Sequence, residues 1–152
     1  MYHYRKTRKT YTKLNKTDKE RAIGCPFPFC DDDSTQEILD QNDTMYVIAN
    51  RVKYDVFEGR RVLDHLMIIP KRHVETLSEF TRQEWQQFGE LAGRYEALGY
   101  NVYARGVASV SRSVKHQHTH LIKCDDHQHK LLIQSQHPYM MIHVLWVECS
   151  TG

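Results

Sequence analysis

The sequence lacks any long apolar run and any dense set of cysteines. Hydrophobic residues make up 40% of its 152 residues, yet polar residues interrupt every apolar stretch before the roughly 20 residues that a membrane-spanning helix needs. The N-terminus is basic and tyrosine-rich without a following apolar segment, so it is not predicted to be a secretory signal. Four cysteines do not make a disulfide framework, which favours a reducing compartment and a bound metal. We therefore expect a soluble, cytoplasmic protein that makes no membrane contact.

The chain also has little net charge, +2, but that charge is unevenly distributed. Residues 1–21 contain eight Lys or Arg and only two acidic residues, so the remainder is slightly acidic. Because this segment has no apolar periodicity, residues 1–22 are predicted to be a flexible, solvated tail. Three tyrosines lie among the basic residues and leave open an alternative in which the segment binds nucleic acid through stacking and phosphate contacts.

Internal repeats and low-complexity segments are absent, and the remaining length can bury a core without disulfides. Residues 23–152 are therefore predicted to form a single domain. Strands are predicted where β-branched and apolar residues cluster, at 44–50, 62–69, 101–108, 114–123 and 141–147. One main helix is predicted at 81–98, because Thr81 and Glu84 fit a capping box, apolar residues follow at helical spacing and Gly99 ends the run. This order favours the α+β class, with a largely antiparallel sheet of about five strands.

Three histidines at alternate positions, His116, His118 and His120, are the most informative feature of the chain. In an extended strand alternate side chains share one face, so the three imidazoles are predicted to line one surface. Imidazole can bind a metal, transfer a proton near neutral pH or attack an electrophile. A catalytic metal held by all three is the less favoured interpretation, because alternate positions of one strand rarely converge on a single ion.

Two other segments carry candidate site residues. Cys25 and Cys30 flank a proline-containing loop at a spacing used in zinc knuckles, but they supply only half of a tetrahedral site, and two buried free thiols are an equal alternative. The linker before the histidines contains Ser111, Arg112 and Ser113, whose hydroxyls and guanidinium are suited to binding an anion.

Two stretches together resemble the histidine triad (HIT) family. Residues 116–122 (HQHTHLI) are similar to its His-x-His-x-His signature with two apolar residues after it. Residues 64–75 (DHLMIIPKRHVE) resemble its strand with a His, an apolar run and Pro-Lys-x-His. The resemblance covers about residues 24–123 and implies a HIT-like fold. It also implies an enzyme, a nucleotide hydrolase or nucleotidyltransferase, that acts on a nucleoside-bearing phosphate such as a phosphoramidate, a dinucleoside polyphosphate or a nucleotide conjugate.

The family pattern implies roles for five residues. His118 matches the nucleophile, which forms a covalent nucleotidyl-histidine. His120 would line the phosphate site, and His65 would support it from the neighbouring strand. Ser113 would contact the leaving-group side. Asn50 matches a residue near the ribose.

The linker departs from the family, which has Gly-Gln-Ser/Thr-Val where this chain has residues 111–114 (SRSV). Arg112, with Ser111 beside it, is predicted to take over the contact with the substrate phosphate.

The resemblance also completes the predicted zinc site. In zinc-containing members two cysteines join the His of Pro-Lys-x-His and the first triad His, which here gives Cys25, Cys30, His73 and His116. Such a Cys₂His₂ set is suited to a closed, structural zinc. The family usually separates the cysteines by two residues, whereas this chain separates them by four. The resemblance further implies a homodimer. A nucleotide- or nucleic-acid-binding protein with weak or no catalysis is the alternative function.

Overall fold

The computed structural model of the protein describes residues 7–10, 12–13, 37–109, 112, 114–128, 132–136 and 139–143. The predicted site residues Cys25, Cys30, Ser111 and Ser113 lie outside this part of the chain. Residues 7–10 and 12–13 are helical, and the Thr7 hydroxyl donates a hydrogen bond to Asp55. None of the helices within the described ranges has the length and apolarity needed to cross a membrane.

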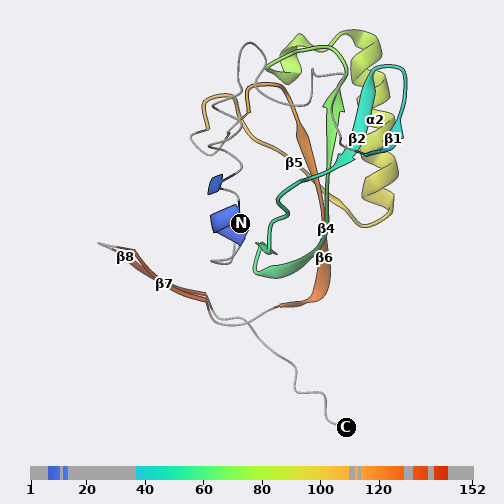
Figure 1. The fold of residues 1–152 in the computed structure, drawn as a ribbon. Helices are drawn as coiled ribbons and strands as arrows, with labels where there is room; N and C mark the ends of the chain where they lie inside the picture. Colours follow the sequence, from blue (N-terminus) through green and yellow to red (C-terminus); the bar gives the residue numbers. More distant parts are fainter. Residues whose placement is uncertain are drawn as a thin grey trace.

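A mostly antiparallel sheet forms the centre of the fold (Figure 1). Its main path runs in the order β1-β2-β4-β6-β5, and the short β3 pairs with β4. The strands are β1 (Ile38–Gln41), β2 (Met45–Ala49), β3 (Val56–Phe57), β4 (Arg60–Pro70), β5 (Asn101–Ala104) and β6 (Thr119–Gln128). Every pairing in this sheet is antiparallel. The predicted α+β class with about five main strands is confirmed.

Individual strands differ from the prediction in identifiable ways. The predicted strands 44–50 and 62–69 correspond to β2 and β4, and 101–108 is shortened to β5. Within the predicted connection 51–61, β3 and β4 form a hairpin whose turn residues Glu58 and Gly59 both have positive φ. The strand predicted at 141–147 begins earlier, at Tyr139. β8 (Tyr139–His143) pairs with β7 (Leu132–Gln136) in a separate two-stranded sheet, and residues 144–147 lie outside the described residues.

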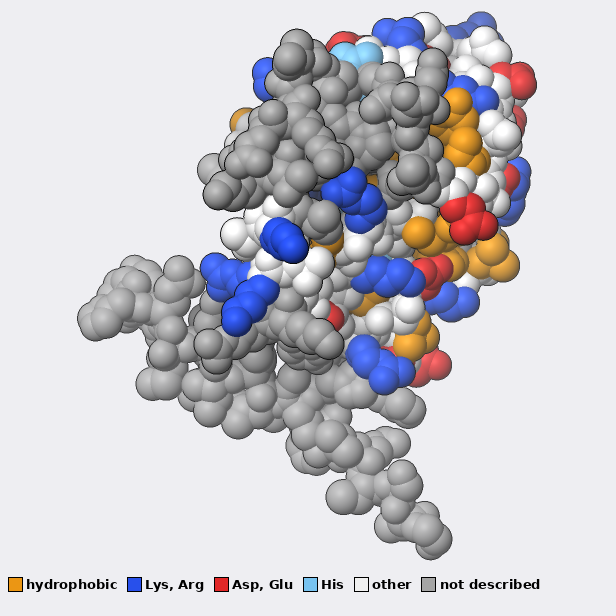
Figure 2. All heavy atoms as spheres, in the orientation of Figure 1, with side chains coloured by type: hydrophobic (Ala, Val, Ile, Leu, Met, Phe, Trp, Pro, Cys, Tyr) orange, Lys and Arg blue, Asp and Glu red, His pale blue; other side chains and the backbone are white. Residues whose placement is uncertain are grey.

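One face of the sheet packs against α2 (Arg82–Ala97), and residues 7–10 and 12–13 lie on the other side in Figure 1. The core under α2 contains Met45, Val47, Leu66, Ile68, Val74, Phe80, Leu91 and Leu121. Hydrophobic side chains are also exposed on the α2 and β1 side of the molecule, where Figure 2 shows them together. His65 and His120 lie on the opposite face, because their neighbours Leu66 and Leu121 belong to the core under α2.

The predicted helix is confirmed together with both of its ends. Thr81 is the N-cap and accepts from the Glu84 N–H at 3.2 Å, while Glu84 accepts from the Thr81 N–H at 2.7 Å. Gly99, with φ +85°, follows the C-cap. Glu84 also binds the Arg72 guanidinium through both oxygens, at 3.0 and 2.8 Å. This ion pair joins the start of α2 to the segment that leaves β4 toward His73.

Replacing Glu84 by Gln is expected to lower the free energy of unfolding by about 2 kcal/mol at pH 7 and to have little effect near pH 2. Hydrogen bonds from Arg72 lower the pKa of Glu84 from 4.5 to about 2. The full shift corresponds to about 3 kcal/mol, and the 51% exposure of the Arg72 side chain reduces it.

A carboxyl with a lowered pKa stabilises the fold above its unfolded pKa. This contribution is lost as the pH falls from about 4.5 to about 2. Urea unfolding across this pH range measures the difference between the wild type and the variant. Glu90→Gln, an exposed change on the same helix, is the control. A difference that stays constant with pH contradicts the assignment.

Candidate active site

The three histidines do not lie on one strand, and this prediction is wrong. β6 begins at Thr119, so only His120 belongs to it, while His116 and His118 precede it in irregular backbone. The reason is a hydrogen bond between distant parts of the chain: the Gln117 N–H donates to the Val74 carbonyl at 2.7 Å instead of to a neighbouring strand. The segment is thereby tied to the residues that follow β4, and the three imidazoles acquire three different surroundings.

His120 lies beside His65 because of the sheet register. On β4 and β6, His65 is opposite Ile122 and Met67 is opposite His120, which makes the two histidines diagonal neighbours on one face. His65 Nε2 and His120 Nδ1 are 2.9 Å apart, and both side chains are buried. Tyr103, opposite His120 on β5, stacks on its ring at a centroid distance of 6.0 Å.

Tyr54 determines which nitrogens of these rings carry hydrogen. Its backbone N–H donates to His65 Nδ1 at 3.1 Å, so the hydrogen of the neutral His65 ring is on Nε2 and is donated to His120 Nδ1. The hydrogen of the neutral His120 ring is then on Nε2, 3.5 Å from the Tyr54 hydroxyl. This hydroxyl also accepts from Arg105 Nη2 at 2.7 Å. The result is a closed circuit that begins and ends at Tyr54.

Asn50 lies at the edge of this circuit. Its Oδ1 accepts from the Val52 N–H at 3.1 Å, and its Nδ2 is 3.1 Å from His65 Nε2. The single hydrogen on His65 Nε2 is used in the shorter contact with His120. Asn50 therefore packs beside His65 and forms part of the wall of the site. A ribose contact for Asn50 stays a prediction.

A backbone carbonyl fixes the orientation of the His118 ring. Its Nδ1 is 2.8 Å from the His116 carbonyl oxygen. Because a carbonyl only accepts, Nδ1 carries the hydrogen, and the lone pair of the neutral ring is on Nε2. Burial lowers the pKa of His118, with further contributions from Arg112 and Arg105, and the side chain is 9% exposed. The neutral form of the ring therefore predominates at pH 7.

His120 is kept neutral by the same effects. Burial lowers its pKa to about 2, and the neighbouring His118, His65 and Arg105 add to the shift. Its ring lies edge-on to that of His118, with centroids 5.1 Å apart. A neutral imidazole in this position acts as a hydrogen-bond donor through Nε2 and adds no charge of its own. Arg105 carries a full positive charge that acts on both the His118 and the His120 rings.

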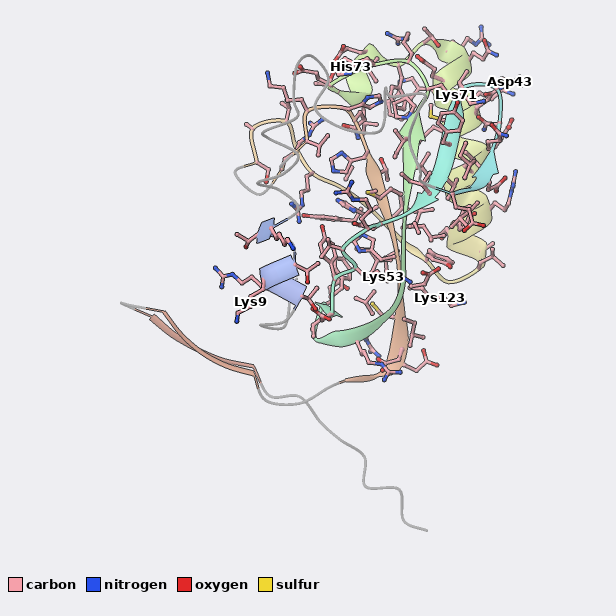
Figure 3. All side chains as sticks on the ribbon, viewed as in Figure 1. Lys9, Asp43, Lys53, Lys71, His73 and Lys123 are labelled. Atoms are coloured by element: carbon pink, nitrogen blue, oxygen red, sulfur yellow. The ribbon has the colours of Figure 1, made fainter. Side chains whose placement is uncertain are left out.

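His116 faces away from this group and toward His73. Its Nε2–H donates to the Pro70 carbonyl at 2.9 Å, so its lone pair is on Nδ1, and burial lowers its pKa to about 4. The His73 ring lies edge-on to it, with centroids 4.9 Å apart, where the chain leaves β4 (Figure 3). A metal-binding histidine typically donates its other N–H to a carbonyl in this way, so the His73–His116 pair fits half of a zinc site.

Within the described ranges, no three His, Cys, Asp or Glu side chains form a metal-binding group. A metal held by all three triad histidines therefore has no support, because His116 turns toward Pro70 and His120 toward His65. The other two residues of the predicted zinc site, Cys25 and Cys30, lie outside the described residues.

Arg112 has a use that the sequence did not reveal. Its Nε donates to the Val114 carbonyl at 3.0 Å, and its Nη2 donates to the carbonyls of Glu75 at 2.5 Å and of Lys115. The guanidinium thus fastens the segment before His116 to the segment after β4. The predicted contact with a substrate phosphate remains a prediction.

Sequence reasoning missed Tyr54, Tyr103 and Arg105. Tyr54 lies in the segment between β2 and β3, Tyr103 is on β5, and Arg105 follows that strand directly. No periodicity marks Tyr54. Tyr103 could have been found from the pairing of two adjacent predicted strands, had their register been known.

Comparisons with known proteins give only distant structural similarities. No protein-family model matches the sequence, and no curated protein matches it. Among solved structures, a "Hit Like Protein" is 14% identical with a TM-score of 0.46, covering 74% of this chain and 98% of that one. A HIT family hydrolase from Clostridium thermocellum is 20% identical with a TM-score of 0.45, covering 75% and 90%. A HIT family hydrolase from Legionella pneumophila is 15% identical with a TM-score of 0.40, covering 71% and 88%.

Proposed function

We propose that this protein is a HIT-type nucleotide hydrolase or nucleotidyltransferase that acts on a nucleoside-bearing phosphate through a covalent nucleotidyl-histidine on His118. The observation that carries the proposal is the hydrogen bond between His118 Nδ1 and the His116 carbonyl, which leaves the lone pair of a buried, neutral imidazole on Nε2. Such a nitrogen attacks without first losing a proton.

The reaction has two displacements. In the first, His118 Nε2 forms a bond to phosphorus and the bond to the leaving group breaks, with the electron pair departing on that group. The ring becomes positively charged, and the His116 carbonyl stabilises it through the Nδ1–H. In the second, water or another acceptor attacks phosphorus and loses its proton to solvent, the P–N bond breaks with its electron pair on Nε2, and the neutral ring is restored. In this mechanism His120 Nε2–H donates to a phosphoryl oxygen, and the hydrogen bond from His65 to His120 Nδ1 supports that tautomer.

Trapping the intermediate tests this proposal. Incubation with an adenosine phosphoramidate or a dinucleoside polyphosphate is expected to add one nucleotidyl group to the intact protein, detected by mass, and acid should remove it. His118→Gln removes the nucleophile at similar size and is expected to show no adduct. An adduct of equal yield on His118→Gln, or one that is stable to acid, contradicts the assignment.

We also propose a structural zinc ion held by Cys25, Cys30, His73 and His116. When bound, the zinc would link the segment before β1 to two others. One contains His73 and follows β4, and the other contains His116 and precedes β6. The support is the His116 Nε2–H bond to Pro70 and the edge-on His73 ring. The metal would supply folding stability, and the two displacements at His118 proceed without it.

Cys25→Ser is expected to lose zinc and to lower the stability by about 3 kcal/mol, or about 10 °C in melting temperature. Metal analysis of the purified protein and thermal unfolding measure the two effects. Cys124→Ser is the matched control, since Cys124 is a free, half-buried thiol on β6. Equal zinc contents in the wild type and Cys25→Ser rule out this ligand set.

A further inference from the structure

Arg112 joins two segments of the chain that meet beside the attacking histidine. On its own segment, Nε donates to the Val114 carbonyl at 3.0 Å and Nη2 donates to the Lys115 carbonyl. Across the junction, Nη2 also donates to the Glu75 carbonyl at 2.5 Å. Because a planar guanidinium fixes the directions of its N–H groups, this one side chain holds three carbonyls in a defined arrangement.

The junction continues from Arg112 to His118 through one peptide group. The Gln117 N–H donates to the Val74 carbonyl at 2.7 Å, and the His116 carbonyl oxygen is 2.8 Å from His118 Nδ1. This N–H and this carbonyl belong to the same peptide group, which is planar and rigid. The bond to Val74 therefore sets the direction in which the carbonyl meets the His118 ring.

The loop that follows β4 is itself anchored on its other side. Arg72 binds both carboxylate oxygens of Glu84 and donates to the Glu79 carbonyl at 2.8 Å. Val74 is completely buried in the core under α2. Since this loop is fixed to the helix and the core, a clamp that holds residues 114–117 against it also fixes them relative to the sheet.

From this geometry we infer that Arg112 is a positioning residue for the attack by His118. Its guanidinium holds the peptide group between His116 and Gln117 against the loop after β4, and this fixes the orientation of the His118 ring. The inference rests on the proposed function and deepens it. It gives Arg112 a different role from the contact with a substrate phosphate that the sequence predicts.

The clamp depends on arginine in particular. A glutamine, which the HIT pattern has at this place, offers two N–H groups from a single nitrogen for three carbonyls. A lysine offers a compact ammonium without a planar fork, so it cannot hold the same carbonyls in the same arrangement. Lysine does keep the positive charge of Arg112, which contributes to the lowered pKa of His118. Arg112→Lys therefore separates the clamp from the charge.

We expect Arg112→Lys to lower kcat about 10- to 100-fold, since a small misplacement of a reacting group has an effect of that size. The Kd for adenosine monophosphate, measured by calorimetry, should stay within about twofold of the wild-type value, because the clamp does not bind the nucleotide. Both are measured well below the unfolding transition of the variant. Arg94→Lys is the matched control, since it removes an exposed guanidinium contact with Asp40 on the far side of the sheet.

Two results would overturn the inference. If Arg112 instead binds the substrate phosphate, the variant binds adenosine monophosphate more weakly and keeps kcat within about threefold of the wild type. If the clamp only stabilises the fold, the melting temperature of Arg112→Lys falls and the kcat of the folded variant is unchanged.

The tautomer of His118 tests the inference without turnover. With isotopically labelled histidine nitrogens, NMR distinguishes a ring that carries hydrogen on Nδ1 from one that carries it on Nε2, and His118→Gln assigns the signal. The wild type should carry it on Nδ1, whereas Arg112→Lys should populate both tautomers, because the His116 carbonyl no longer holds one direction. If no substrate is turned over, the proposed function fails and this measurement decides the role of Arg112 separately. Equal tautomer populations in the two proteins reject it.

Discussion

Replacing His118 by glycine is expected to lower kcat/KM by about 10⁴-fold or more, and added imidazole is expected to restore part of the activity. The loss is large because the covalent route ends when the attacking nitrogen is removed. The site that remains can only orient water. Imidazole can refill the space that the side chain leaves and accept the nucleotidyl group, since the His116 carbonyl is still present to hold its N–H.

Initial rates over a range of imidazole concentrations measure this effect. Imidazole should leave the rate of the wild type unchanged, and this serves as the control for a direct reaction in solution. Mass spectrometry of the products of the rescued reaction should detect free nucleotidyl-imidazole. Turnover of His118→Gly within about tenfold of the wild type, without imidazole, is incompatible with a nucleophilic His118.

Much of the scaffold could be read from the sequence because local chemistry determines it. The Thr81–Glu84 capping box and Gly99 define both ends of α2, and both have the predicted geometry. The turn at Glu58 and Gly59 was predictable for the same reason, since a glycine tolerates the positive φ that a tight turn needs. β1 and β3 were missed because short strands carry too few residues to show a pattern.

The triad shows where pattern reasoning ends. The alternate spacing of His116, His118 and His120 is consistent with a strand. The same spacing is equally consistent with extended backbone that is hydrogen-bonded to a loop. The bond from Gln117 to Val74 decided between them, and it joins residues far apart in the sequence. The three histidines have different surroundings because of that contact, and a simple strand would not have produced them. The family resemblance implies a different role for each.

Residues that complete a site from other strands are the hardest to predict. Tyr54 meets His65 and His120 only because β4 and β6 pair in one particular register. Arg105 reaches Tyr54 because β5 pairs with β6 so that Ala104 is opposite Thr119. A shift of one residue in the pairing of β4 with β6 would move His65 or His120 to the other face of the sheet. Periodicity indicates which face of a strand is buried, but it does not identify the residue opposite each position.

Replacing His65 by leucine is expected to lower kcat/KM by about 10²- to 10³-fold and the stability by about 2 kcal/mol. Leucine fills the space but leaves the Tyr54 N–H and His120 Nδ1 without their partner. The hydrogen of His120 is then no longer fixed on Nε2, so the ring loses its donor toward the phosphate for part of the time. The unpaired, buried Tyr54 N–H accounts for the loss of stability.

His65→Gln separates these two effects, because a glutamine amide can reach the position of His65 Nε2 and donate to His120. It is expected to recover at least about tenfold in kcat/KM over His65→Leu. Met67→Leu is the control on the same strand and face, a change of similar volume with no polar role. Steady-state kinetics and urea unfolding on the three variants give both quantities. If leucine and glutamine at position 65 reduce kcat/KM equally, His65 supports the site only through packing. His120 then does not depend on it for the position of its hydrogen.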